Sequence, residues 1–189
     1  MELIDFRRPA NGFAHALHLW LACHDRFERV VALVERLAQH VADHGPDDAA
    51  RVTAREVRRY FDQAAPRHHE DEDIDIFPLV LRRAREARLN GEADTAARTI
   101  DRLVADHRAL DAQWPQLRDM LNGIELQQPV AIDPVLVGQF VHSQLEHHLA
   151  EDQVICPLAQ RLLTPEDLGL LGTVMAARRG LAWSELAAA

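Results

Sequence analysis

Cysteine is scarce in this chain, with only Cys23 and Cys156 among 189 residues. Both lie in apolar helical patterns, so we predict buried free thiols in preference to a disulfide or a redox pair. The sequence thus lacks the cysteine framework of small secreted proteins. We expect a protein of the reducing cytoplasm.

Long apolar runs and basic clusters are also missing. Met1 to Ala14 contains no continuous apolar stretch, and histidines interrupt any export segment that could follow the Arg7-Arg8 pair. We therefore expect no signal peptide and no membrane span. The formal net charge is −9, which argues against nucleic acid or an anionic membrane surface as a partner.

Few stretches have the pattern of β-strands, and good helix formers dominate. Turn residues divide the chain into helices predicted at roughly 11–43, 48–89, 92–121, 133–163 and 165–186. Four long helices with short links predict an all-α fold. We expect an up-down-up-down four-helix bundle over residues 1–163, with a short C-terminal helix in 164–189 packed on the same domain. Pro66, Pro78 and Pro157 predict bends within helices, not ends.

The apolar face of each long helix is interrupted by polar residues near its middle. Apolar residues recur at spacings of three and four on each face, which is the pattern of a buried helix. Burial of an imidazole or a carboxylate without a partner is costly. Four interruptions, one on each helix, therefore indicate one common site. In chain order they are His24, then His68 and Glu72, then His107, then His147 and Glu151.

Two of these helices carry copies of one repeat. Residues 68–79 and 147–158 both follow the pattern His-His-x-x-Glu-Asp-x-x-Ile-x-Pro-Leu. Residues four apart on a helix have Cβ atoms about 5–6 Å apart. The first histidine and the glutamate of each copy can therefore bind one metal, or two adjacent metals if the carboxylate bridges them.

The six interrupting residues together predict a two-metal site with His24, His68, Glu72, His107, His147 and Glu151 as ligands. Four imidazoles and two bridging carboxylates suit two cations about 3.5–4 Å apart. Mixed nitrogen and oxygen donors favour iron, manganese, zinc or copper over magnesium or calcium. The set contains no cysteine, which argues against an iron–sulfur cluster. Two ferrous ions and two glutamates leave positive charge that a bridging hydroxide or oxo group can lower.

Each of these residues taken singly has a simpler explanation. A lone histidine on an apolar stripe is usually a satisfied core residue, and an acidic run such as 70–75 is usually a solvated face. The neighbouring His69 and His148 point about 100° away on an ideal helix, so we expect surface or supporting roles. For the adjacent aspartates we expect solvated surface, and for the tryptophans core positions: Asp25, Asp73, Asp106, Asp152, Trp20, Trp114 and Trp183.

The pattern resembles the hemerythrin-like family, also called the HHE cation-binding domain, over roughly residues 15–163. The residues that carry the resemblance are His24-Asp25, His68-x-x-x-Glu72-Asp73 with Ile76-Phe77-Pro78, Asp106-His107, and His147-x-x-x-Glu151-Asp152 with Pro157. The resemblance implies a non-haem di-iron centre with carboxylate bridges inside a four-helix bundle. It also implies reactivity with dioxygen, nitric oxide or peroxide.

The sequence departs from the oxygen-carrier branch of that family. Those proteins have a second histidine four residues after the one on the third helix, and Asp111 stands there in this chain. The chain looks more like the bacterial stress-response branch linked to repair of iron centres. Alternatives are metal storage or buffering, a helical interaction module stabilised by its metal, and a ferritin-like site. The last has the opposite order of glutamate and histidine.

Overall fold

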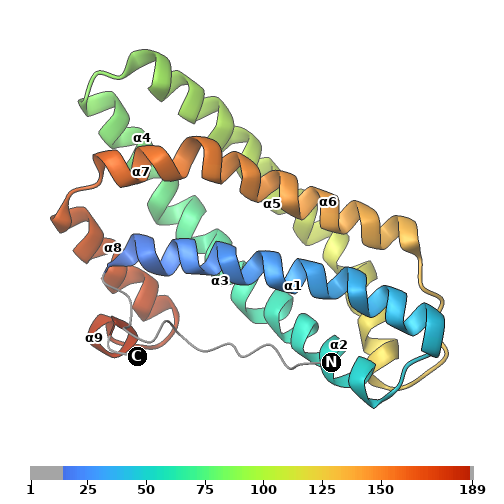
Figure 1. Cartoon of the computed structure of the whole chain (residues 1–189). Helices are drawn as coiled ribbons and strands as arrows, with labels where there is room; N and C mark the ends of the chain where they lie inside the picture. Colours follow the sequence, from blue (N-terminus) through green and yellow to red (C-terminus); the bar gives the residue numbers. More distant parts are fainter. Residues whose placement is uncertain (1–14, 188–189) are drawn as a thin grey trace.

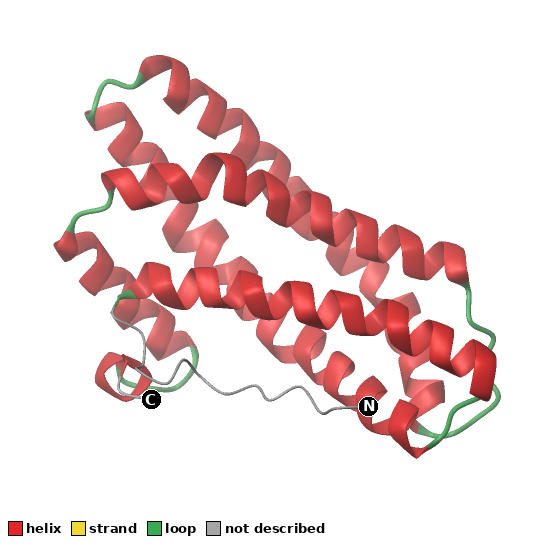
Figure 2. Ribbon diagram, viewed as in Figure 1, coloured by secondary structure: helices red, strands yellow, loops and turns green. Residues whose placement is uncertain are grey.

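The computed structural model describes residues 15–187, and every regular element within that range is helical. Four long helical segments lie side by side, and the links between successive segments lie at the ends of the bundle (Figure 1, Figure 2). The predicted all-α bundle is therefore confirmed. The expectations about Arg7-Arg8 and a signal peptide lie outside the described residues.

The first segment is α1 (Ala16–His44). The second is a continuous path through α2 (Asp48–Arg59), η1 (Tyr60–Ala64), α3 (Ala65–Glu70), η2 (Asp71–Ile76) and α4 (Phe77–Glu86). The third is α5 (Asn90–Glu125). The fourth joins α6 (Pro134–Ala150), η3 (Glu151–Ile155) and α7 (Cys156–Leu162), and α8 (Pro165–Arg178) and α9 (Trp183–Ala187) follow. Within the described range, no helix is both long enough and apolar enough to cross a bilayer.

The three π-helical turns η1, η2 and η3 each end just before an X-Pro step, and the helical path continues through the proline. Proline has no N–H, and its ring clashes with the carbonyl four residues back in a regular α-helix. A wider turn before the proline relieves that conflict, and such turns often mark functional sites. In each turn the bond spans five residues: Ala65 N–H to Tyr60 O, Phe77 N–H to Glu72 O, and Cys156 N–H to Glu151 O.

The hydrophobic core is divided into two clusters. One contains Phe27 and Phe140, near the α1–α2 end of the bundle. The other contains Trp20 and Ile155, near α4, α7 and α8. His24 lies between Trp20 and Phe27 on α1. The polar residues predicted from the sequence thus occupy a layer between two apolar cores.

The third helix is longer than the predicted range 92–121. Helix α5 begins at Asn90, and it continues through Asn122-Gly123 to Glu125. Gly123 is needed for packing, because a Cβ at that position would lie 2.5 Å from Val130 Cγ2. The loop after α5 folds back onto the helix at that point. Local propensity could not reveal this long-range contact.

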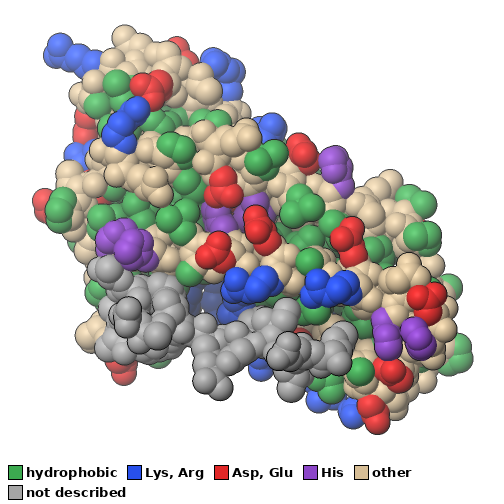
Figure 3. All heavy atoms as spheres, in the orientation of Figure 1, with side chains coloured by type: hydrophobic (Ala, Val, Ile, Leu, Met, Phe, Trp, Pro, Cys, Tyr) green, Lys and Arg blue, Asp and Glu red, His purple; other side chains and the backbone are tan. Residues whose placement is uncertain are grey.

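The predicted helix over 165–186 is two helices, α8 and α9. Gly180 separates them with φ of 71°, a left-handed conformation that favours glycine. Thr164 and Asp167 form a capping box at the start of α8. Helix α8 packs against α1 and η2. On the face shown in Figure 3, acidic side chains are scattered, in keeping with the net charge of −9.

The end of α8 is bound to η2 by a buried ion-pair cluster. Asp71 is fully buried and pairs with Arg178 and, at 2.7 Å, with Arg179 Nη2. Arg178 also donates to Asp75 Oδ2 at 2.7 Å. Because Asp71 immediately precedes Glu72, this cluster anchors the C-terminal helix beside the polar layer.

We expect the double variant Arg178→Met/Arg179→Met to lose about 3–5 kcal/mol of unfolding free energy, because it leaves the Asp71 carboxylate buried without a counter-charge. Urea unfolding followed by circular dichroism measures the loss. Adding Asp71→Asn to the double variant is the control, and it should recover part of the stability because the buried charge is removed. A double variant with the same unfolding free energy as the parent would show that the ion-pair cluster does not stabilise the fold.

Candidate metal centre

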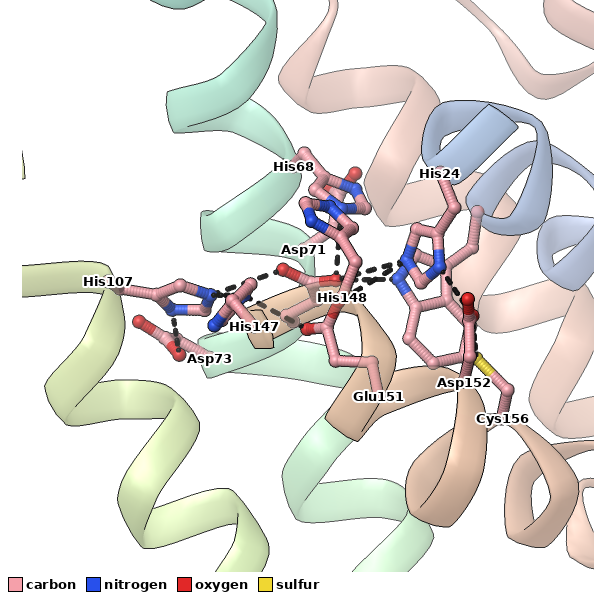
Figure 4. A network of polar contacts seen from close by, with 12 residues as sticks. His24, His68, Asp71, Asp73, His107, His147, His148, Glu151, Asp152 and Cys156 are labelled. Atoms are coloured by element: carbon pink, nitrogen blue, oxygen red, sulfur yellow. Dashed lines mark hydrogen bonds and ion pairs between the residues drawn. The ribbon is translucent and has the colours of Figure 1, made fainter. Parts of the chain in front are cut away.

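The six predicted ligands converge on one buried level of the bundle. They come from α1, α3, η2, α5, α6 and η3, and none is more than 4% exposed. Figure 4 shows His107 and His147 on one side of Glu151, His24 on the other, and His68 above the carboxylates. The distances below group His68 with His24. We call these two sides the His24 half and the His107 half.

In the His24 half, two imidazoles face one oxygen of each glutamate. His24 Nε2 lies 3.7 Å from Glu72 Oε1 and 3.5 Å from Glu151 Oε2. His68 Nε2 lies 3.1 Å from Glu72 Oε1. Two nitrogen and two oxygen donors therefore surround one point between α1, α3 and the two π turns.

The His107 half repeats this arrangement with the other two oxygens. His107 Nε2 lies 3.5 Å from Glu72 Oε2, and His147 Nε2 lies 3.3 Å from Glu151 Oε1. The two Nε2 atoms are 3.0 Å apart. Each glutamate thus divides its two oxygens between the halves, which is the arrangement that bridging carboxylates require.

Five of the eight donor atoms of this cluster lack a hydrogen-bond partner among the described residues. The unpartnered buried atoms include His24 Nε2, His68 Nε2, Glu72 Oε2 and both carboxylate oxygens of Glu151. A buried carboxylate without a partner costs several kcal/mol. Cations bound between the imidazoles and the carboxylates would satisfy all of these atoms together, so the residues fit a two-metal centre.

Two aspartates orient the lone histidines, which corrects the expectation that they are only solvated. His24 Nδ1–H donates to Asp152 Oδ1 at 2.9 Å, and His107 Nδ1–H donates to Asp73 Oδ1 at 2.9 Å. In each repeat the glutamate enters the cluster, while the following aspartate reaches a histidine on a neighbouring helix. These bonds direct Nε2 of each ring toward the glutamates.

The remaining aspartates differ from this pair. Asp106 Oδ2 lies 3.8 Å from His147 Nδ1, too far for a hydrogen bond. Asp25 is exposed, as expected from the sequence. Asp111 is also exposed and belongs to none of the candidate metal-binding groups among the described residues. Asp111 therefore does not replace the histidine that stands at its position in oxygen carriers.

The expectation of surface positions for the second histidines of the repeats is wrong. His69 is 8% exposed and His148 is 3% exposed. The His69 ring is stacked on His107 with centroids 4.0 Å apart, and the His148 ring lies on Phe27 with centroids 3.8 Å apart. A helix inside the bundle touches two neighbours, so more than one stripe is buried.

Trp20 takes part in the cluster, which the sequence did not reveal. Its indole Nε1–H donates to Glu72 Oε1 at 2.7 Å, and the side chain is fully buried. The residue was expected to be a core anchor, and its ring does belong to one hydrophobic cluster. Its place one turn before His24 was the available signal, because residues four apart share a helix face.

The charges of the cluster are strongly coupled. Burial and the nearby charge of Glu72 raise the pKa of Glu151 well above its usual range. Burial also disfavours the ionised form of Glu72, but His68 and the other imidazoles outweigh it and hold the pKa of Glu72 well below its usual range. The two carboxylates do not ionise together easily unless positive charge lies between them.

The histidines divide into neutral and protonated groups. Burial lowers the pKa of His68 well below its usual range and that of His147 to about 2. Burial opposes protonation of His24 as well, yet Asp152 and the glutamates raise its pKa to about 10. In His107, burial is likewise outweighed by Glu72 and Asp73, so its pKa is raised. Each half thus favours one positive charge.

Solvent reaches the edge of the His107 half. A groove of about 280 Å³ between α5 and α6 is lined by Asp106, Gln113 and His147, among other residues. A second cavity of about 150 Å³ is lined by His69, Gln144 and Asp111, with other residues. Both cavities adjoin the His107 half, and neither has a lining residue from the His24 half.

The sequence of this chain is similar to those of known proteins. The family model of the hemerythrin HHE cation binding domain matches residues 15–159, a range that includes all six predicted ligands. A protein of Haemophilus influenzae described as uncharacterized is 26% identical over 179 residues, which cover 95% of this chain and 98% of that protein. The similarity therefore extends over nearly the full length of both chains.

Proposed function

Because this chain belongs to the hemerythrin HHE cation-binding domain family, we propose that its buried cluster holds two iron ions. His24 and His68 would hold one ion, His107 and His147 would hold the other, and Glu72 and Glu151 would serve both. The observation that carries the proposal is the division of each glutamate between the halves. Oε1 of Glu72 faces His24 and His68, while Oε2 faces His107.

The proposed activity is binding of, or reaction with, dioxygen, nitric oxide or peroxide. When bound, a pair of iron ions supplies redox chemistry and open coordination positions for such molecules. The surrounding residues hold the ligands in place and keep bulk water out, because both bridging glutamates are fully buried. The groove beside His147 gives a small molecule access.

A role in sensing or stress response, including repair of iron centres, fits the donor set better than reversible oxygen carriage. Carriage in the family is associated with a histidine four residues after the one on the third helix. Asp111 stands at that place and is exposed. The centre is therefore expected to be more open to reaction than that of a carrier.

Elemental analysis of protein purified without added metal tests this proposal, together with the visible spectrum under azide and nitric oxide. We expect two irons per chain and charge-transfer bands that shift with both ligands. Zinc alone would overturn the proposed activity and favour a structural or storage role. Two irons with a spectrum that does not change on addition of azide or nitric oxide would have the same meaning. Less than one metal per chain after reconstitution would overturn the two-metal site itself.

Asp152→Ala is expected to weaken metal binding in the His24 half by about 10–100-fold, since partners that orient a ligating histidine typically contribute that much. Competition with a chromophoric chelator measures the affinity of each ion. The matched control is Asp25→Ala, which removes an exposed aspartate directly beside His24. Equal affinities in the two variants would show that the bond between Asp152 and His24 does not support the site.

A further inference from the structure

His148 has the geometry of a metal ligand, although it is not one of the six residues of the proposed centre. Its Nδ1 lies 2.9 Å from the backbone carbonyl oxygen of Gln144. A carbonyl can only accept a hydrogen bond, so Nδ1 carries the proton and Nε2 of the neutral ring carries the lone pair. A ligating histidine commonly donates its other N–H to a backbone carbonyl in this way.

The lone pair of His148 is buried and lacks a partner. Its Nε2 makes no hydrogen bond to any described residue, and the side chain is only 3% exposed. Ligand atoms of His148, His24, His68 and Glu151 all lie within 4.8 Å of one another. An unpartnered nitrogen thus accompanies three of the four donors of the His24 half, namely those of His24, His68 and Glu151.

The three imidazoles of that half surround one point. The His148 ring centroid is 5.0 Å from that of His24 and 6.0 Å from that of His68, and the His24 and His68 centroids are 5.2 Å apart. His24 is nearly perpendicular to both of the other rings. Three rings at these separations can each point a nitrogen at one cation.

The corresponding histidine of the other repeat does not have this geometry. His69 also has a ligand atom within 4.8 Å of those of His107 and His147. However, its ring is stacked face to face on His107, at 4.0 Å and an interplanar angle of 16°. A nitrogen lone pair lies in the plane of its ring, so two parallel rings in face-to-face contact at 4.0 Å cannot both direct one at the same ion. The His68 and His148 rings are also nearly parallel, at 6°, but their centroids are 6.0 Å apart, a separation at which two rings can lie on opposite sides of one cation.

We propose that His148 is a further metal ligand in the His24 half, and that His69 is not a ligand. This inference rests on the proposed two-metal function. It makes the halves unequal, with three imidazoles and two carboxylate oxygens in the His24 half against two imidazoles and two carboxylate oxygens in the His107 half. The two ions should then bind with different affinities, the tighter in the His24 half.

The test compares His148→Phe with His69→Phe. Each variant replaces the second histidine of a repeat and keeps an aromatic ring against its neighbour, Phe27 or His107 respectively. Cobalt(II) is titrated into metal-free protein against a competing chelator. We expect His148→Phe to lower the affinity for one of the two cobalt ions by at least about tenfold. The His69→Phe variant should bind both ions with the affinities of the parent.

Two results separate the failure of this inference from failure of the proposed function. If His148→Phe binds both cobalt ions with parental affinity, His148 is not a ligand, although the two-metal centre stands. If the parent itself does not bind two cobalt ions, the proposed function fails. The cobalt-loaded parent supplies a second measurement that does not depend on folding of the variant. Proton NMR should show five strongly shifted, exchangeable imidazole N–H signals, and four would overturn the role of His148.

Discussion

Glu72→Gln is expected to release both metal ions, whereas loss of a histidine should release only one. The Glu72 oxygens face different halves, with Oε1 near His24 and His68 and Oε2 near His107. A glutamine has a single acceptor oxygen and no charge. Groups that merely orient ligands contribute about 10–100-fold to affinity. Loss of a bridging ligand should therefore lower the binding affinity of each ion by more than that.

Metal content after desalting, followed by titration with ferrous iron without oxygen, measures this effect. His24→Ala serves as the comparison, and it should retain the ion of the His107 half. Glu146→Gln is the matched control, because Glu146 also follows a histidine by four residues but is exposed. That variant should keep both ions. If Glu72→Gln retained one ion at parental affinity, Glu72 would be a terminal ligand and not a bridge.

Removal of the metal is expected to lower the thermal midpoint by about 15–30 °C. An ion present at 1,000 times its dissociation constant stabilises the folded state by about 4 kcal/mol, and two such ions by about 8 kcal/mol. For a chain of this length, each kcal/mol shifts the midpoint by about 2–4 °C. Without cations the buried carboxylates depend on protons held by His24 and His107, whose pKa values are raised.

Calorimetry of protein before and after chelation measures the shift, and ferrous iron added without oxygen should restore the original midpoint. The Glu72→Gln variant is the control, because it holds little metal and its midpoint should hardly respond to the chelator. A shift of only a few degrees in the parent would mean that the protons stabilise the cluster nearly as well as metal does.

The buried polar layer could be predicted because its pattern is local. Helical periodicity places residues three and four apart on one face, so His68 and Glu72 could be paired from spacing alone. The division of the core into two apolar clusters agrees with the polar interruption predicted in each stripe. The ends of α5 and α8 were less predictable. Gly123 packs against Val130 in the loop after α5, and Gly172 packs against Trp183 in α9, so both depend on contacts outside their own helices.

The second histidines show where one-helix reasoning fails. An ideal helix turns His69 and His148 away from the ligand stripe, and both were expected nearer the surface. In the bundle, His69 meets His107 of α5 and His148 meets Phe27 of α1. Burial of these residues depends on which neighbours each segment has, and the sequence pattern of one helix does not contain that information.

The sequence by itself determined that the chain is helical and that six buried polar residues occupy a common level, because both properties follow from spacing along single helices. Only the tertiary structure decided which glutamate oxygen faces which histidine, and that Asp152 and Asp73 orient His24 and His107. Those partners are 128 and 34 positions apart in the chain. Their contacts depend on the relative rotation and axial position of packed helices, which local periodicity leaves free.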